Sequence, residues 1–119
     1  MLRARVCYGH VGGQLGVDIA ALLRKDGVID DLTPGESGTV RTFDQPLLTA
    51  LGITTLPDAR PGVRACLDWS HGTVHLAGAL GAALFTALLD DGWVRRSPGG
   101  RALRITEPGR RRFTELGIG

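Results

Sequence analysis

Two cysteines and two of the three histidines form two similar pairs in this chain of 119 residues. Cys7 precedes His10 by a short interval, and Cys66 precedes His75 by a longer one. Two thiolates and two imidazoles are a suitable ligand set for tetrahedral zinc, while a thiol beside an imidazole is the arrangement of a Cys–His nucleophile. Neither interval matches a zinc-finger pattern, and free cysteines are frequently packing residues. We therefore favour structural thiols over a metal site, a disulfide or an enzyme, and we predict no catalytic residue, metal ligand or cofactor.

The same residues and their neighbours define a candidate ligand site. If the two halves of the chain pack against each other, these side chains converge on one cleft with two aromatic rings beside it, which is typical of a small-molecule pocket. The predicted ligand-binding residues are Cys7, Tyr8, His10, Cys66, Asp68, Trp69 and His75. The alternative is structural, because an imidazole placed directly before a helix can donate to a local backbone carbonyl and order the helix start.

An internal repeat predicts how these residues are positioned. His10–Gly16 aligns with His75–Gly81, and the same offset continues without a gap to Ile53 and Ile118. Identical residues recur along this alignment, and at several other aligned positions both copies have an apolar residue. We interpret the repeat as an ancestral duplication.

Each copy contains the pattern of an amphipathic helix. Apolar residues recur with helical spacing over Val11–Leu23 and Leu76–Leu88, which indicates the inward stripe of a helix. Both patterns end at an Asp-Gly pair, where glycine can adopt the left-handed conformation that ends a helix. The segments ahead of them, Leu2–Tyr8 and Val63–Trp69, are expected to form a further short helix in each copy.

A β-hairpin is expected after each amphipathic helix. In the second copy, Trp93–Arg96 and Arg101–Thr106 alternate on either side of the turn segment Ser97–Gly100, which predicts a hairpin. The first copy has a longer acidic connection, Asp30–Gly38, before Thr39–Phe43, so the hairpin signal there is weaker.

A closing helix follows each hairpin. Asp44 or Thr42 is expected to cap the first closing helix, and Thr106 the second. Pro46 and Pro108 lie near the first turn, where a missing N–H is harmless.

These elements predict an α+β fold of two tandem winged-helix-like repeats, each consisting of a helix, a β-hairpin wing and a helix. Repeat 1 covers residues 1–53, repeat 2 covers residues 63–119, and residues 54–62 are the linker within a single domain of residues 1–119. Half of the chain is too small to bury its own apolar face well. We therefore expect the repeats to pack about a pseudo-two-fold axis and to share one core.

The formal net charge of +2 conceals an excess of arginine toward the C-terminus. Arg95, Arg96, Arg101 and Arg104 surround the Pro-Gly-Gly tip of the second wing. Such a wing can bind DNA phosphates, with strong salt dependence and no base specificity of its own. The alternative is a solvated arginine-rich face that reflects coding bias.

Four segments carry a family resemblance: Ala65–Trp69, His75–Leu84, Gly92–Arg96 and Arg101–Thr106. They resemble the distal half of long-form ArsR-type bacterial transcriptional regulators. Cys7–Gly13 resembles the Cys-Tyr-Asp-His-Leu-Ala-Gly string of that group, with Gly9 in place of Asp. In the group these repeats follow a helix-turn-helix reading head, and no complete helix-turn-helix pattern is present in this sequence. The resemblance implies winged-helix architecture and a role in transcription regulation.

We predict a regulator-like protein with a small-molecule effector cleft between the repeats and contacts from the second wing to duplex DNA. One alternative is a stand-alone ligand-sequestering module that does not bind DNA, and a less favoured one is a small Cys/His-dependent enzyme. The sequence is also compatible with a homodimer. The apolar segments fall short of the roughly 20 residues of a bilayer span, and no secretory signal pattern is present. The expected location is the cytoplasm, without membrane attachment and with both cysteines reduced.

Overall fold

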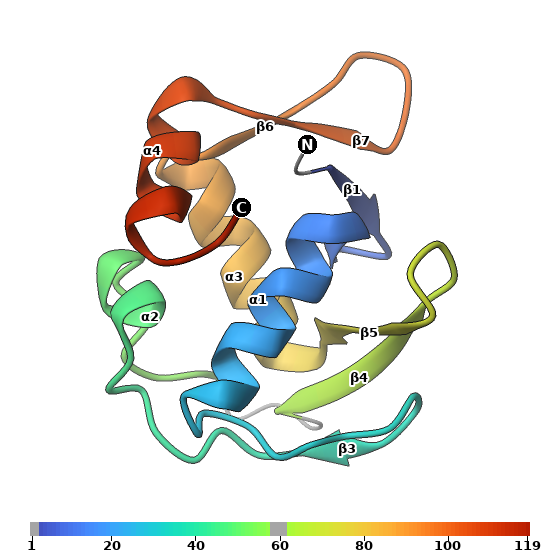
Figure 1. Cartoon of the computed structure of the whole chain (residues 1–119), viewed down its shortest axis with the longest axis vertical. Helices are drawn as coiled ribbons and strands as arrows, with labels where there is room; N and C mark the ends of the chain where they lie inside the picture. The colour runs from blue at the N-terminus through green and yellow to red at the C-terminus, as the bar shows by residue number, and fades with distance from the viewer. Residues whose placement is uncertain (1–2, 58–61) are drawn as a thin grey trace.

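Residues 3–57 and 62–119, which the computed structural model describes, form helices and two small antiparallel sheets (Figure 1). The α+β prediction is confirmed. No helix in these two ranges is both long and apolar enough to cross a bilayer. In chain order the elements are β1 (Ala4–Cys7), β2 (His10–Gly12), α1 (Gly13–Lys25), β3 (Ser37–Gly38), α2 (Pro46–Ala50), β4 (Val63–Asp68), β5 (Thr73–Ala77), α3 (Gly78–Asp90), β6 (Val94–Arg96), β7 (Ala102–Ile105) and α4 (Glu107–Glu115).

Each sheet contains strands from both halves of the chain. The four-stranded sheet has the order β2-β1-β7-β6, and the three-stranded sheet has the order β3-β4-β5. Ala4 of β1 lies opposite Leu103 of β7, and Gly38 of β3 lies opposite Val63 of β4. The halves are therefore joined by strand pairing as well as by side-chain packing.

The two long helices pack on the strands of the opposite half. Helix α1 lies against β5, and α3 lies against β2. The buried core between them includes Leu15 and Leu23 of α1, Leu80 and Leu88 of α3, and Phe113 of α4. All three residues of β2 and the central residues of β5 are buried. Helices α1 and α3 cross near the middle of the view in Figure 1.

The predicted amphipathic helices are confirmed, and they are built alike. Both α1 and α3 contain 13 residues. Their first residues, Gly13 and Gly78, each have a φ of +76°. Gly27 and Gly92, which follow the terminal aspartates, also have positive φ, as expected for glycines that end helices. Each helix begins slightly later than predicted, because the residues before it belong to a strand.

The prediction of short leading helices over Leu2–Tyr8 and Val63–Trp69 is wrong. Leu2 lies outside the described residues, and the described parts of these segments form β1 and β4. In β4, the exposed Arg64 stands between the buried Val63 and Ala65, an alternation typical of a strand. Each strand turns back into β2 or β5, so its backbone groups are paired without a helix.

The hairpin predicted for the second copy is confirmed as β6–β7, but within the described residues the first copy forms no hairpin between α1 and α2. Its short strand β3 pairs with β4 of the second copy instead. Asp30 forms an ion pair with Arg41 at 2.8 Å, and Asp31 forms one with Arg24 at 3.5 Å. The acidic connection therefore forms a loop and one short strand, and the prediction of a hairpin after the first amphipathic helix is wrong.

The closing helices are confirmed as α2 and α4, with one change of cap. Thr106 caps α4 as predicted. Gln45, rather than Asp44 or Thr42, caps α2 and accepts a hydrogen bond from the Leu48 amide at 3.0 Å. Residues 58–61 of the predicted linker lie outside the described part of the chain.

Candidate functional site

Strands β1 and β2 form a hairpin, called the first hairpin below. Its tip places Cys7 directly opposite His10. Tyr8 and Gly9 connect the two strands, with φ values of +40° and +84°. Positive φ at both central positions is the requirement of a type I′ hairpin turn, and glycine satisfies it without strain. Because residues that pair directly across two strands point to the same face, this turn projects a thiol and an imidazole side by side.

Strands β4 and β5 form the second hairpin, which repeats this Cys–His pair with a longer connection between its strands. Cys66 lies opposite His75, and the pairing continues until Asp68 lies opposite Thr73. The additional residues of this hairpin therefore supply a carboxylate that the first hairpin lacks. Asp68 is fully buried.

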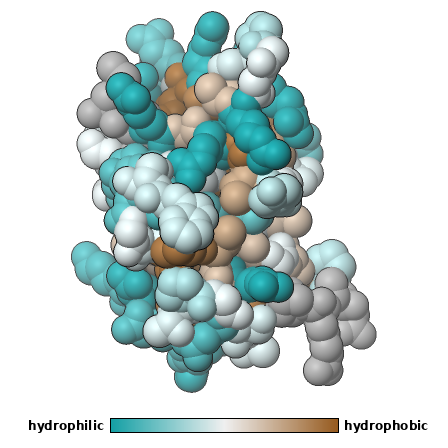
Figure 2. Space-filling view, turned by 90° about the vertical axis from the view of Figure 1, so that its right-hand side faces the viewer, coloured by the Kyte–Doolittle hydropathy of each residue, from teal (hydrophilic) through white to brown (hydrophobic). Residues whose placement is uncertain are grey.

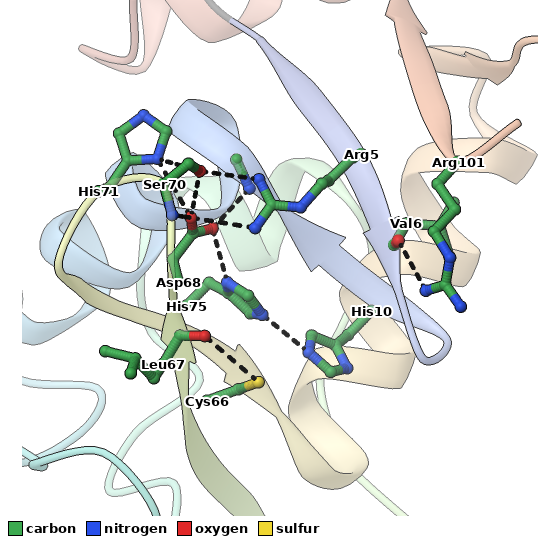
Figure 3. Close-up of polar contacts among 11 residues, drawn as sticks. Arg5, Val6, His10, Cys66, Leu67, Asp68, Ser70, His71, His75 and Arg101 are labelled. Carbon is green, nitrogen blue, oxygen red and sulfur yellow. Dashed lines mark hydrogen bonds and ion pairs between the residues drawn. The ribbon is translucent and has the colours of Figure 1, made fainter.

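The two hairpins bring Cys7, His10, Cys66 and His75 together, and these four residues are called the Cys–His quartet below. Their ligand atoms, two Sγ and two ring nitrogens, lie within 4.8 Å of one another. The Nε2 atoms of His10 and His75 are 2.9 Å apart (Figure 3). Both imidazoles are buried and both thiols are half-buried. Four of the residues predicted to bind a ligand thus meet at one place.

Asp68 fixes the orientation of the His75 ring. One carboxylate oxygen accepts a hydrogen bond from the Gly13 amide at 2.7 Å and lies 2.9 Å from Nδ1 of His75. The other oxygen accepts from Arg5 at 3.0 Å and from Ser70 at 2.6 Å. Burial raises the pKa of Asp68, but hydrogen bonds from Ser70, the Gly13 amide and two imidazoles outweigh it and hold the pKa far below its usual value. Asp68 is therefore an anion that accepts the Nδ1 proton of His75 (Figure 3).

Both imidazoles of the quartet are neutral at pH 7. Burial and the neighbouring His75 lower the pKa of His10 to about 4, against a backbone hydrogen bond to Tyr8 that raises it. Burial also lowers the pKa of His75, against the hydrogen bond and the charge of Asp68. With its single proton on Nδ1, His75 presents an unprotonated Nε2 to the quartet.

The thiol of Cys66 is not activated as a nucleophile. Burial and the adjacent Cys7 raise its pKa. Reactive cysteines require a lowered pKa. This direction of shift speaks against the thiol-dependent enzyme considered from the sequence.

Two glycines allow the close approach of the imidazoles, and sequence reasoning gave them no role. A Cβ at Gly16 would lie 3.1 Å from the Cβ of His75, and one at Gly81 would lie 3.3 Å from the Cβ of His10. Each helix therefore contacts the histidine of the opposite half through a glycine. The sequence signal that could have identified them is that Gly16 and Gly81 occupy equivalent positions in the internal repeat.

A cleft of about 460 Å³ opens beside the quartet, at the seam between the halves. Its wall is mainly apolar, and Arg64 supplies a cation at its rim. The first half contributes Tyr8, Gly9, His10, Pro34 and Gly35, and the second half contributes Arg64, Ala65, Cys66, Leu67, Ala77, Gly78 and Ala82.

The two aromatic residues predicted for the ligand site lie at the surface. Tyr8 is 85% exposed and Trp69 is 86% exposed. Tyr8 lines the edge of the cleft, whereas Trp69 lies in the connection of the second hairpin and is not among the lining residues. Asp68 contacts His75 from the side away from His10 (Figure 3).

The four arginines of the β6–β7 hairpin are exposed. Two of them face each other across the strands, and the other two each lie over an aromatic ring. Arg95 lies directly opposite Arg104 across β6 and β7. Arg96 lies over the ring of Phe85, and Arg101 lies over the ring of Tyr8, each with its guanidinium carbon 5.1 Å from the ring centroid. Figure 2, which faces the side of the molecule at the right of Figure 1, shows hydrophilic residues around scattered hydrophobic ones.

Like charges directly opposite each other on neighbouring strands are unfavourable. Within the described residues, no carboxylate forms an ion pair with Arg95 or Arg104. This pair is therefore free to bind an external anion.

The chain is similar to a regulator from a bacterium. It is 36% identical over 113 residues to YdfF of Bacillus subtilis (strain 168), which is named as an uncharacterized HTH-type transcriptional regulator. The match covers 92% of this chain and 49% of YdfF, so the chain spans about half the length of this relative. No family model matches the chain, and no solved structure matches it.

Proposed function

We propose that this chain is the effector-binding part of a winged-helix transcriptional regulator of the ArsR type. The similarity to YdfF supports a role in transcription regulation. The equal lengths and matching first residues of α1 and α3 support an ancestral duplication. The contact between the equivalent residues His10 and His75 supports a pseudo-two-fold axis between the two halves. The succession α3, β6, β7, α4 has the helix–hairpin–helix order of a winged-helix copy.

The observation that carries effector binding is the cleft to which both halves contribute. A mainly apolar wall with one cation at its rim suits a small apolar molecule that carries an anionic group. The cleft edge is also connected to the second wing. Arg101 lies over the Tyr8 ring, and the carbonyl of Arg101 accepts a hydrogen bond from the Val6 amide at 2.7 Å. An effector that displaces the Tyr8 turn therefore acts directly on the wing.

Filling the cleft should abolish effector binding. Ala82 is exposed on α3 and lines the cleft, so Ala82→Trp occupies the space without disturbing the core. We expect an aromatic carboxylate present at 100 times its Kd to raise the Tm of the wild type by about 5 °C or more. Ala82→Trp should lose this shift, and Arg64→Gln should weaken it. The measurement is thermal unfolding with a panel of aromatic carboxylates and their neutral amides.

Thr86→Trp is the matched control, since Thr86 is exposed on the same helix outside the cleft. It should respond as the wild type does. A panel that leaves the wild-type Tm unchanged, or an Ala82→Trp variant that still responds, would exclude the cleft as the effector site.

The facing arginines of the second wing favour a contact to DNA phosphates. The wild type is expected to bind duplex DNA weakly at low salt, with affinity that falls as salt rises. The double variant Arg95→Ala/Arg104→Ala should reduce the slope of log affinity against log salt by about 2, because two phosphate contacts are lost. Fluorescence anisotropy with a labelled duplex at several salt concentrations measures this slope.

Arg24→Ala/Arg41→Ala removes two arginines that form ion pairs with Asp31 and Asp30, and it should leave the slope unchanged. If the wild type binds no DNA at low salt, the chain is instead the ligand-sequestering module considered from the sequence.

A further inference from the structure

We infer that the Cys–His quartet is a tetrahedral binding site for one divalent cation of the zinc type. The inference deepens the proposed function, because two members of the quartet line the effector cleft. It reverses the expectation from sequence that these thiols are only structural.

The donor set and its spacing fit such an ion. Two sulfurs and two imidazole nitrogens form one of the common structural zinc sets, with Zn–S near 2.3 Å and Zn–N near 2.0–2.1 Å. Tetrahedral geometry then separates neighbouring ligand atoms by about 3.3–3.8 Å. The ligand atoms of the quartet lie within 4.8 Å of one another, and the two Nε2 atoms are 2.9 Å apart. Side-chain movements of about 1 Å convert this arrangement to the tetrahedral one.

The backbone supplies the four ligands as two equivalent pairs. Cys7 and His10 face each other across the first hairpin, and Cys66 and His75 do so across the second. Each pair is held by strand pairing, and the two hairpins contact each other through β2 and β5. The site is therefore largely formed by backbone pairing before any ion binds.

Asp68 orients His75 in the manner of an outer-shell partner. Metal-binding histidines commonly donate their second ring N–H to a carboxylate, which fixes the tautomer and raises the basicity of the ligating nitrogen. Nδ1 of His75 lies 2.9 Å from Asp68, and the opposite nitrogen, Nε2, faces the quartet. Asp68 is itself held by the Gly13 amide and by Arg5.

The two imidazoles meet through equivalent nitrogens. Nε2 of His75 lies 2.9 Å from Nε2 of His10, and both rings are buried. Because Asp68 accepts the Nδ1–H of His75, its Nε2 directs a lone pair at this point. A cation held there binds one nitrogen from each half of the chain.

The other uses of these side chains explain less of the geometry. A disulfide engages only the sulfurs and gives the two rings no role. A nucleophilic thiol needs one imidazole as its base and gives the second Cys–His pair no role. Only a metal ion engages all four side chains, and the half-buried thiols leave the site within reach of solvent.

Cobalt titration of the full chain tests the site. The protein is reduced, treated with a chelator and titrated with Co²⁺, and then Zn²⁺ is added. We expect one Co²⁺ per chain, the visible absorption bands of tetrahedral cobalt, a thiolate-to-cobalt charge-transfer band, and loss of all bands when Zn²⁺ displaces the Co²⁺. Cys7→Ser and Cys66→Ser should each weaken Co²⁺ binding by at least about 100-fold, more than the loss of an outer-shell partner causes.

His71→Gln is the matched control, because His71 contacts Asp68 but is not part of the quartet, and it should bind Co²⁺ as the wild type does. Circular dichroism confirms that each compared variant is folded. Folded wild type that binds no Co²⁺, or serine variants that bind it like the wild type, would overturn the inference. The titration contains no DNA and no effector, so its failure leaves the proposed function standing. Ala82→Trp, which removes the effector response, should retain Co²⁺ binding.

Discussion

Asp68→Ala is expected to lower the free energy of unfolding by about 3–5 kcal/mol. The substitution leaves the Gly13 amide and Nδ1–H of His75 buried without an acceptor. Each such orphaned donor costs about 1–3 kcal/mol, while removal of a buried carboxylate recovers part of its own desolvation cost. Domains of this size are typically stable by only about 5–15 kcal/mol, so a large share of the stability is lost.

The Asp68 effect is measured by urea unfolding at pH 7. Asp90→Asn, which changes an exposed aspartate, should alter the free energy of unfolding by less than about 0.5 kcal/mol. Because the folded-state pKa of Asp68 is lowered, its stabilisation is fully present above the unfolded value of about 3.9 and is lost as the pH falls toward the folded value. The gap between wild type and Asp68→Ala should therefore narrow below about pH 4. An equal gap at pH 7 and pH 3 would contradict this account.

The sequence alone predicted the elements that local patterns specify. Apolar spacing located α1 and α3, and the Pro-Gly-Gly turn located the β6–β7 hairpin. The repeat also indicated that both Cys–His pairs occupy equivalent places, which the matching registers of the two hairpins bear out.

The short strands were missed because their partners are distant in sequence. Strand β1 pairs with β7, and β3 pairs with β4. A strand of four residues carries too little periodicity to be separated from a helical turn. Exchange of strands between the halves is a property of the tertiary structure, so no window of the sequence contains it.

The candidate site was predicted in its members but not in their roles. Asp68 was expected to face a ligand, and it instead holds the His75 ring from behind. Trp69 was expected beside the cleft, and the longer second hairpin places it at the surface. Arg5 was not considered, since its contact to Asp68 depends on two hairpins that meet only in the folded chain.

Gly16→Ala and Gly81→Ala are each expected to destabilise the fold by about 3 kcal/mol. A Cβ at Gly16 would lie 2.3 Å from the carbonyl oxygen of Val11, and a Cβ at Gly81 would lie 2.3 Å from that of Leu76. These oxygens belong to the strands that precede each helix, so relief requires the helix to move away from its strand. Alanine normally favours a helix over glycine by about 1 kcal/mol, and the clash is expected to exceed this gain.

The double variant Gly16→Ala/Gly81→Ala should be largely unfolded at 25 °C, because the two losses together approach the total stability of a small domain. Gly100→Ala is the control, since a Cβ there meets no atom within 4 Å, and it should stay within about 0.5 kcal/mol of the wild type. Urea unfolding followed by circular dichroism measures the wild type and all four variants. Single alanine variants as stable as the wild type would show that the helices can withdraw from β2 and β5 without cost. The two imidazoles would then not be held together by the close approach of these glycines.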